Sequence, residues 1–179
     1  MIFGKIIKGF NKKVKIEDLS KKYKVRRLGV NDIEEVYHLC SKNTMYYEYC
    51  PPFITIEGVK EDMEALPPGK NYEDKFFLGY YENEVLIAIM DLIVGYPNEK
   101  TIYIGLFMTN VSIQGRGIGT TIIQELCEYC KMQGYERIEL AWVKGNPQSE
   151  AFWKKNGFTP IEERSSNVAE HVIAAELRL

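Results

Sequence analysis

The stretch Gln114-Gly115-Arg116-Gly117-Ile118-Gly119-Thr120 constrains the fold more than any other part of the sequence. It follows an apolar segment with strand character at residues 101–108 and opens a helical pattern over residues 117–133. Glycines at alternate positions allow a tight turn and keep side chains away from the start of the helix. A further strand pattern at residues 137–143 completes a strand–helix–strand unit, which indicates a mixed α and β fold.

The other patterns are short strands and helices. Strands are expected at residues 24–28, 76–81, 85–94, 159–163 and 171–179, and helices at residues 31–40, 55–66 and 146–156. Residues 41–54 are rich in aromatic side chains, end in two prolines and are expected to form a loop.

Length and composition indicate one globular domain. The chain has 179 residues, 45% of them hydrophobic and 27% charged. Only Cys127 and Cys130 form a C-x-x-C pair, and a four-ligand metal site would need a second pair, so no metal is expected. Free cysteines and the lack of a long apolar run favour a reducing cytoplasm as the location.

The first 24 residues differ from the rest in charge. They hold eight lysines against Glu17 and Asp18, a balance of +6, and since the whole chain carries -2, the remainder carries -8. An acidic body disfavours nucleic acid and mildly favours a cationic substrate. Ile2, Phe3, Ile6, Ile7 and Phe10 recur at roughly helical spacing between the lysines. We expect residues 1–24 to be a basic extension packed on a domain of residues 25–179, and we rank contact with a membrane surface below that.

Taken alone, the glycine stretch predicts an anion site at a helix N-terminus, suited to a pyrophosphate. Its spacing is not that of dinucleotide folds, and it lacks the G-K-[ST] of a P-loop. A tight turn without any ligand is the structural alternative, and an unrelated nucleotide binder is a further one.

Two motifs together carry a resemblance to a family. Q-G-R-G-I-G is followed by a helix, a strand, Asn146 and the run A-F-W-K-K-N-G-F at residues 151–158. This pattern resembles the GNAT superfamily of N-acetyltransferases. The resemblance implies a largely antiparallel twisted sheet of about seven strands flanked by about four helices. It also implies transfer of an acetyl group from acetyl-CoA to a primary amine by direct transfer in a ternary complex, without a metal.

The same resemblance assigns cofactor-binding positions. Phe107, Met108 and Thr109 would offer main-chain groups to the pantetheine arm, and the backbone N–H of Met108 would stabilise the oxyanion. Gln114, Gly115, Arg116, Gly117, Ile118, Gly119 and Thr120 would cradle the pyrophosphate, with Asn146 and Trp153 beside the arm.

The sequence departs from the family pattern at two positions. Trp153 stands where a tyrosine often protonates the thiolate, and Ala141 stands where some members carry a basic glutamate. Asp91, a lone carboxylate in the apolar run 87–94, is our candidate for the general base, with structural hydrogen bonding as the alternative. Tyr103 is a further candidate catalytic residue.

The loop residues Tyr46, Tyr47, Glu48 and Tyr49 are expected to bind the acceptor, since aromatic rings with one carboxylate suit an amine. The alternative is a hydrophobic loop packed on the sheet. The acceptor itself stays open between a small-molecule and a peptide amine. So does the oligomeric state, with a homodimer as one option. A non-catalytic acyl-CoA-binding or regulatory module is the alternative function, because the usual tyrosine and glutamate are missing.

Overall fold

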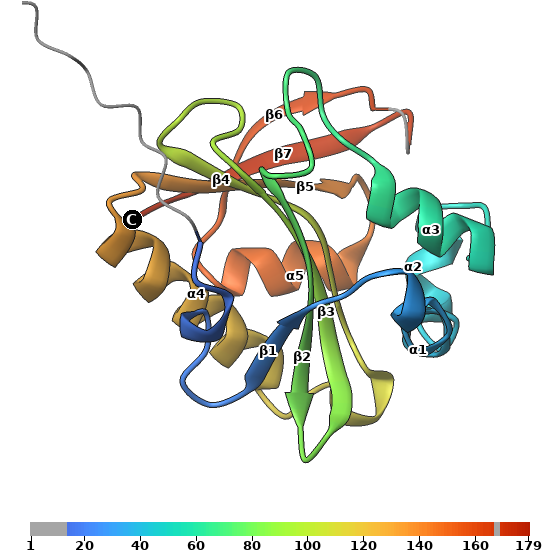
Figure 1. The fold of residues 1–179 in the computed structure, drawn as a ribbon. Coiled ribbons are helices and arrows are strands. Elements are labelled where there is room, and N and C mark those ends of the chain that lie inside the picture. The colour runs from blue at the N-terminus through green and yellow to red at the C-terminus, as the bar shows by residue number, and fades with distance from the viewer. Residues whose placement is uncertain (1–13, 167–168) are drawn as a thin grey trace, which may run out of the picture.

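The computed structural model describes residues 14–166 and 169–179 (Figure 1). The strands are β1 (Lys24–Arg27), β2 (Lys75–Glu82), β3 (Val85–Val94), β4 (Thr101–Thr109), β5 (Arg137–Val143), β6 (Thr159–Arg164) and β7 (Val172–Arg178). The helices are α1 (Ile33–Cys40), α2 (Thr44–Tyr49), α3 (Ile56–Glu64), α4 (Ile118–Gln133) and α5 (Pro147–Lys155). Three single 3-10 turns, at Ile16–Asp18, Val30–Asp32 and Val111–Ile113, complete the list for these residues.

The seven strands form one sheet in the order β1-β2-β3-β4-β5-β7-β6. All neighbours are antiparallel except β4 and β5, which run parallel because α4 crosses between them. The predicted α/β class, the largely antiparallel seven-stranded sheet and the strand–helix–strand unit are therefore confirmed.

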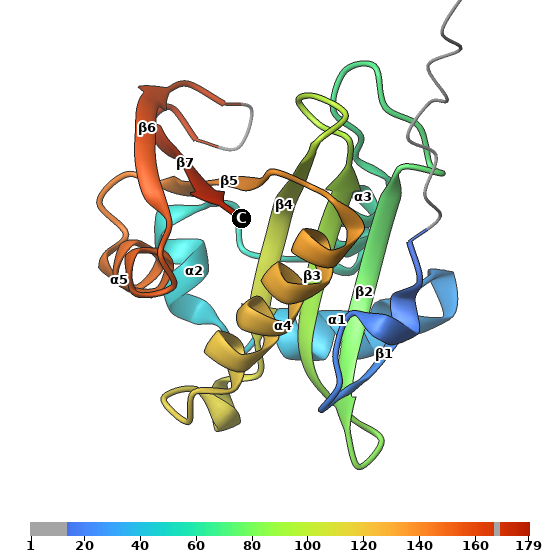
Figure 2. The same ribbon diagram turned by 90° about the vertical axis from the view of Figure 1, so that its left-hand side faces the viewer.

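Helices cover both faces of the sheet. Helices α4 and α5 lie on one face and α1, α2 and α3 on the other (Figures 1 and 2). The larger hydrophobic core includes Leu126 of α4, Trp153 of α5 and Met90 of β3, whereas the smaller one joins Val36 of α1 and Val59 of α3 to Ile89. Ile89 and Met90 belong to different cores because successive side chains of a strand point to opposite faces.

The sheet opens between β4 and β5. The two strands pair only from Thr101 with Arg137 to Ile104 with Leu140, although β4 continues to Thr109. At this point β4 also carries a bulge on its other edge, since Asp91 is paired with Leu106 and Leu92 with Ile104, leaving Gly105 extra. From here on we call the opening the β4–β5 split.

One element differs from expectation. Residues 41–54, predicted as a loop, contain the short helix α2, so the described residues hold five α-helices rather than about four. Tyr46 and Tyr47 of this helix pack against the smaller core. This tertiary contact stabilises a helical turn that has no strong sequence periodicity of its own.

The described part of the N-terminal segment lies against the domain. Val14, Leu19 and Tyr23 belong to the larger core, and the backbone N–H of Lys15 donates to the hydroxyl of Tyr129 on α4 at 3.0 Å. The apolar residues Ile2, Phe3, Ile6, Ile7 and Phe10 lie outside the described residues, and the boundary at residue 24 stays a prediction. Within the described ranges, no helix is both long and apolar enough to cross a membrane.

Candidate active site

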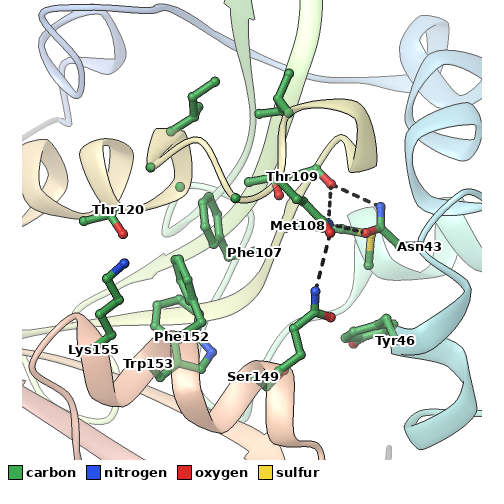
Figure 3. A pocket seen from close by; sticks show the side chains of 17 residues that line it. Asn43, Tyr46, Phe107, Met108, Thr109, Thr120, Ser149, Phe152, Trp153 and Lys155 are labelled. Carbon is green, nitrogen blue, oxygen red and sulfur yellow. Dashed lines mark hydrogen bonds between the residues drawn. The ribbon is translucent and has the colours of Figure 1, made fainter.

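A cavity of about 240 Å³ lies at the β4–β5 split. Its walls come from the end of β4, the glycine stretch, the start of α4 and one side of α5, with Asn43 and Tyr46 of the α1–α2 region closing one end (Figure 3). The predicted cofactor residues that line it are Phe107, Met108, Thr109, Gln114, Gly115, Gly117, Ile118, Gly119, Thr120 and Trp153.

The three glycines of the stretch are needed for two different reasons. Gly115 and Gly117 have φ angles of +77° and +80°, which side chains rarely tolerate. Gly119 is helical, but a Cβ there would lie 3.2 Å from the ring of Phe152 on α5. The first two glycines therefore form the turn, and the third lets α4 approach α5 closely beside the cavity.

Aromatic rings form the apolar wall. Phe107 of β4 stacks on Phe152 of α5 with ring centroids 5.8 Å apart. Trp153 makes an edge contact with Phe152 at 4.9 Å and with Phe158 at 5.1 Å. These contacts hold the rings in place without a ligand, so the wall is preformed.

Main-chain groups at the end of β4 face the split in alternation. The N–H of Asn110 donates to the carbonyl of Ile87 at 2.8 Å, and Met108 is the strand partner of Ile89. Because bonded and non-bonded pairs alternate along an antiparallel ladder, the N–H of Met108 points to β3. The main-chain groups of Phe107 and Thr109 then face the split, so the geometry favours Phe107 over Met108 as the backbone donor.

Two predicted cofactor residues do not line the cavity. Arg116 is exposed at the tip of the loop. Asn146 is 3% exposed and caps α5, its side-chain oxygen accepting the N–H of Ser149 at 3.1 Å. Six lining residues were missed by the sequence reasoning: Asn43, Ile113, Gln148, Ser149, Phe152 and Lys155. The run at 151–158 could have suggested Phe152 and Lys155, whereas Asn43 carries no local signal.

Of the four predicted acceptor residues, only one lines the cavity. Tyr46 lines the cavity, and its ring makes an edge contact with that of Tyr47 at 5.0 Å. Burial raises the pKa of both hydroxyls, which are therefore neutral at physiological pH. Tyr47, Glu48 and Tyr49 are not part of the cavity lining, and Glu48 is exposed.

Asp91 lies on β3, on the sheet face covered by α1–α3. Its Oδ2 accepts from Nζ of the buried Lys75 at 2.7 Å. Its Oδ1 is buried and has no hydrogen-bond partner among the described residues. A Cβ on Gly105 would lie 2.7 Å from Oδ2, so the carboxylate sits directly over the bulge of β4. Burial raises the pKa of Asp91, and Lys75 opposes that shift.

Tyr103 of β4 and Glu139 of β5 lie side by side where the two strands are still paired, next to the split. They are strand partners on β4 and β5, one residue before the pairing ends. Burial raises the pKa of Tyr103, with Arg164 acting against it. Burial also raises the pKa of Glu139, and the Arg137 guanidinium, 4.0 Å away, lowers it. Neither residue lines the cavity, and Glu139 was not singled out from the sequence.

A third carboxylate, Asp62 on α3, was also missed. It follows the buried Val59 by three residues, which places it on the helix side near the sheet. Partial burial raises its pKa to about 6, with Lys75 lowering and Asp91 raising it. Asp62, Asp91 and Glu139 thus lie on the side of the sheet opposite α4, and none of them lines the cavity.

The cavity lining has the chemistry that the pyrophosphate and pantetheine arm of acetyl-CoA would need. A Cβ on Gly115 or Gly117 would meet no described atom within 4 Å, so the space before the loop is open. The first N–H groups of α4 lack partners within the helix and point into that space. Within residues 14–166 and 169–179, no cluster of three His, Cys, Asp or Glu side chains could hold a metal ion.

A mixed sheet that opens beside a glycine-rich helix start is the architecture of the acyltransferases that the two motifs resemble. The chain belongs to the acetyltransferase (GNAT) family, which it matches over residues 42–158.

Individual relatives agree with this family. The chain is 32% identical over 109 residues to the uncharacterized N-acetyltransferase YobR of Bacillus subtilis, a match that covers 60% of this chain and 40% of that protein. It shares its fold with an acetyltransferase from Thermus thermophilus, at a TM-score of 0.74 and 16% identity over 88% of this chain and 97% of the other. A spermidine N-acetyltransferase from Vibrio cholerae, solved with CoA and spermine, gives a TM-score of 0.64 at 16% identity over 89% and 96%.

Proposed function

We propose that this protein transfers an acetyl group from acetyl-CoA to a primary amine, directly and with both substrates bound. The observation that carries the proposal is the cavity at the β4–β5 split, which joins a glycine-rich helix start to the end of β4 at Phe107 and Thr109. When bound, acetyl-CoA supplies a thioester carbonyl that an amine nitrogen can attack.

The residues of the cavity have distinct tasks in this proposal. Backbone N–H groups of residues 115–120 bind the pyrophosphate, with the α4 dipole favouring its charge. Lys155 lies across the cavity from Thr120 (Figure 3) and adds a cation for the phosphates. Phe107 directs its N–H to the thioester oxygen, and the rings of Phe152 and Trp153 exclude water from the arm. Asn146 supports this wall by holding the start of α5.

The amine approaches from the face of α1–α3, where the carboxylates lie. An ammonium ion is attracted to this acidic face but must lose a proton before it attacks. We propose Asp91 as the base, because its Oδ1 has an unused acceptor position and burial raises its pKa. Tyr46 forms the aromatic wall for the acceptor, and Tyr103 with Glu139 lies at the closed end of the split.

The Vibrio enzyme, whose name specifies a small polyamine, is compatible with such an acceptor, but its likeness to this chain is one of fold. A small-molecule or peptide amine is therefore the acceptor class that we propose. Release of CoA thiol across a panel of polyamines, aminoglycosides and peptides with free N-termini would identify it.

A thermal-shift titration with acetyl-CoA, CoA, ATP and NAD tests the cofactor first. A ligand at about 100 times its Kd stabilises by about 2.7 kcal/mol, which raises Tm by roughly 5–10 °C at this size. We expect that rise with both CoA forms and not with ATP or NAD. Binding without CoA release on any amine would instead support an acyl-CoA-binding module, and no rise with either CoA form would refute the proposal.

A further inference from the structure

A buried asparagine connects the two walls of the cavity. Asn43 is 8% exposed and stands between α1 and α2, where it also lines the cavity. Its Nδ2 donates to the carbonyl of Leu39 at 3.0 Å and to that of Thr109 at 3.2 Å. Its Oδ1 accepts from Nε2 of Gln114 at 2.9 Å. One amide group thus contacts the end of α1, the end of β4 and the glycine stretch.

The network continues on both sides of Asn43. Nε2 of Gln114 lies 3.4 Å from the same Thr109 carbonyl, and Oε1 of Gln114 accepts from Gln148 of α5 at 3.4 Å (Figure 3). On the other side, the carbonyl of Asn43 accepts the N–H of Tyr46 at 3.1 Å. The path therefore runs from α5 through the glycine stretch to the tyrosine of the acceptor wall.

The chemistry of this position is specific to an amide. The carbonyls of Leu39 and Thr109 require a donor, and Gln114 requires an acceptor on the same side chain. Aspartate would supply only the acceptor and place a negative charge beside two carbonyl oxygens. A buried amide that uses both N–H groups and its oxygen holds its neighbours in one arrangement.

We propose that Asn43 is a positioning residue that couples the two substrate sites, so that ordering of the glycine stretch by CoA also orders α2 and Tyr46. Asn43 acts through Gln114 and through the backbone of Tyr46. The inference rests on the proposed function in that CoA is the ligand of the glycine stretch.

Hydrogen exchange with and without CoA tests this coupling in the full chain. In the wild type, we expect CoA to slow exchange both at residues 114–120 and at residues 44–49. In Asn43→Ala the protection at residues 114–120 should persist, while that at residues 44–49 is lost. CoA affinity, measured by calorimetry, should fall roughly tenfold, since the loop loses a buried hydrogen bond of ordinary strength.

Further variants separate positioning from folding. Asn43→Asp keeps the bond to Gln114 but loses the Nδ2 bonds that fix residue 43 to the carbonyls of Leu39 and Thr109. It should therefore lose the α2 protection while retaining more CoA affinity than Asn43→Ala. Gln114→Ala should also abolish the α2 protection, and in the double variant with Asn43→Ala the two losses of affinity should not add. Asn98→Ala is the matched control, because Asn98 accepts two turn hydrogen bonds far from the cavity, from Lys100 N at 3.1 Å and Thr101 Oγ1 at 3.0 Å.

The outcomes are distinct. Unchanged α2 protection in both Asn43 variants and in Gln114→Ala would overturn the coupling, whatever their Tm. CoA protection confined to residues 114–120 in the wild type would overturn it as well. No CoA binding by the wild type would refute the proposed function itself, and the coupling with it. If Asn43→Ala does not fold, Asn43→Asp and Gln114→Ala decide.

Discussion

Beside the split, the α4–α5 side of the sheet presents main-chain groups, aromatic rings and one cation, Lys155, whereas the α1–α3 side carries several carboxylates. In the proposed function, Gly115, Gly117 and Phe107 act through backbone geometry, which does not change with pH. Asp62, Asp91 and Glu139 have pKa values raised by burial. From this contrast we expect that binding of the proposed cofactor depends on conformation, and recognition of the proposed amine on charge.

Among the charged residues of the α1–α3 side, the Lys75–Asp91 pair should have the largest effect on the free energy of unfolding. Either Lys75→Met or Asp91→Asn leaves a buried partner unpaired, so each should lower the free energy of unfolding by about 3–5 kcal/mol. Urea denaturation measures this loss. A drop below about 1 kcal/mol in both variants would show that water reaches the pair.

Turnover distinguishes the two variants of that pair. Asp91→Asn should cut kcat on the identified amine tenfold or more and leave CoA affinity unchanged, because it removes the proposed base. Lys75→Met keeps the carboxylate but removes the charge that lowers its pKa, so the acidic limb of the kcat/KM profile should move to higher pH. Unchanged turnover in folded Asp91→Asn protein would remove Asp91 from the mechanism.

The proposed role of the glycine turn can be tested at the two glycines that flank α4, because both have a positive φ angle. Gly117 before the helix and Gly134 after it have φ angles of +80° and +83°. Alanine at either should cost about 1–2 kcal/mol of strain. Only Gly117→Ala should also weaken CoA, by roughly tenfold, because its turn presents the N–H groups. Equal CoA affinities in calorimetry would contradict a binding role for this turn.

Neighbouring lysines of α5 provide a smaller test. Lys155 lines the cavity, whereas Lys154 pairs with Glu150 at 2.5 Å on the exposed side. Lys155→Ala should reduce CoA affinity by roughly twofold to fivefold, in line with an exposed charge pair, and the loss should shrink at high salt. Lys154→Ala should leave affinity unchanged. Equal losses would mean that only overall charge matters.

The smallest expected effect is on stability and concerns Asp62. Its folded-state pKa of about 6 lies above the ordinary 3.8, so the folded protein binds this proton more tightly than the unfolded chain. Ionised Asp62 therefore costs stability above pH 6 and not below about pH 4. Asp62→Asn should raise stability at pH 8 by less than about 1 kcal/mol, because its carboxyl is only partly desolvated and solvent still screens the charge, and the gain should shrink at pH 5.

Thermal unfolding at both pH values checks the Asp62 prediction. Glu61→Gln, an exposed neighbour on α3, controls for the loss of one negative charge. A gain for Asp62→Asn that is equal at pH 5 and pH 8 would contradict the raised pKa.

The sequence predicted the strand, the turn and the helix ends beside the cavity well, because each is a contiguous segment of the chain. The strand before residue 110, the glycine stretch and the caps of α4 and α5 are local features with local causes. The Met108 donor expected from the sequence lies one residue from the Phe107 donor that we propose, because strand register depends on a bulge that no single segment reveals.

The grouping of carboxylates on the α1–α3 side of the sheet could not be predicted in the same way. Asp62, Asp91 and Glu139 come from three separate elements of the chain, and only the tertiary fold places them on the same side of the sheet. Asn43 is a further case, since its partners Thr109 and Gln114 lie 66 and 71 residues away. Asp91 was found because a carboxylate in an apolar run is itself a local anomaly.

The extra residue Gly105 also sets the phase of the strand. Before it, Ile102 and Ile104 point to the α4–α5 core, and without a bulge residue 106 would follow them. Instead Leu106 and Met108 point to the α1–α3 core and Phe107 to the α4–α5 core. If Gly105 were paired regularly with Asp91 instead of bulging, every later residue of β4 would move by one position along β3. That shift would exchange Phe107 for Met108 in the wall of the cavity and turn the peptide groups that now face the split back into the sheet.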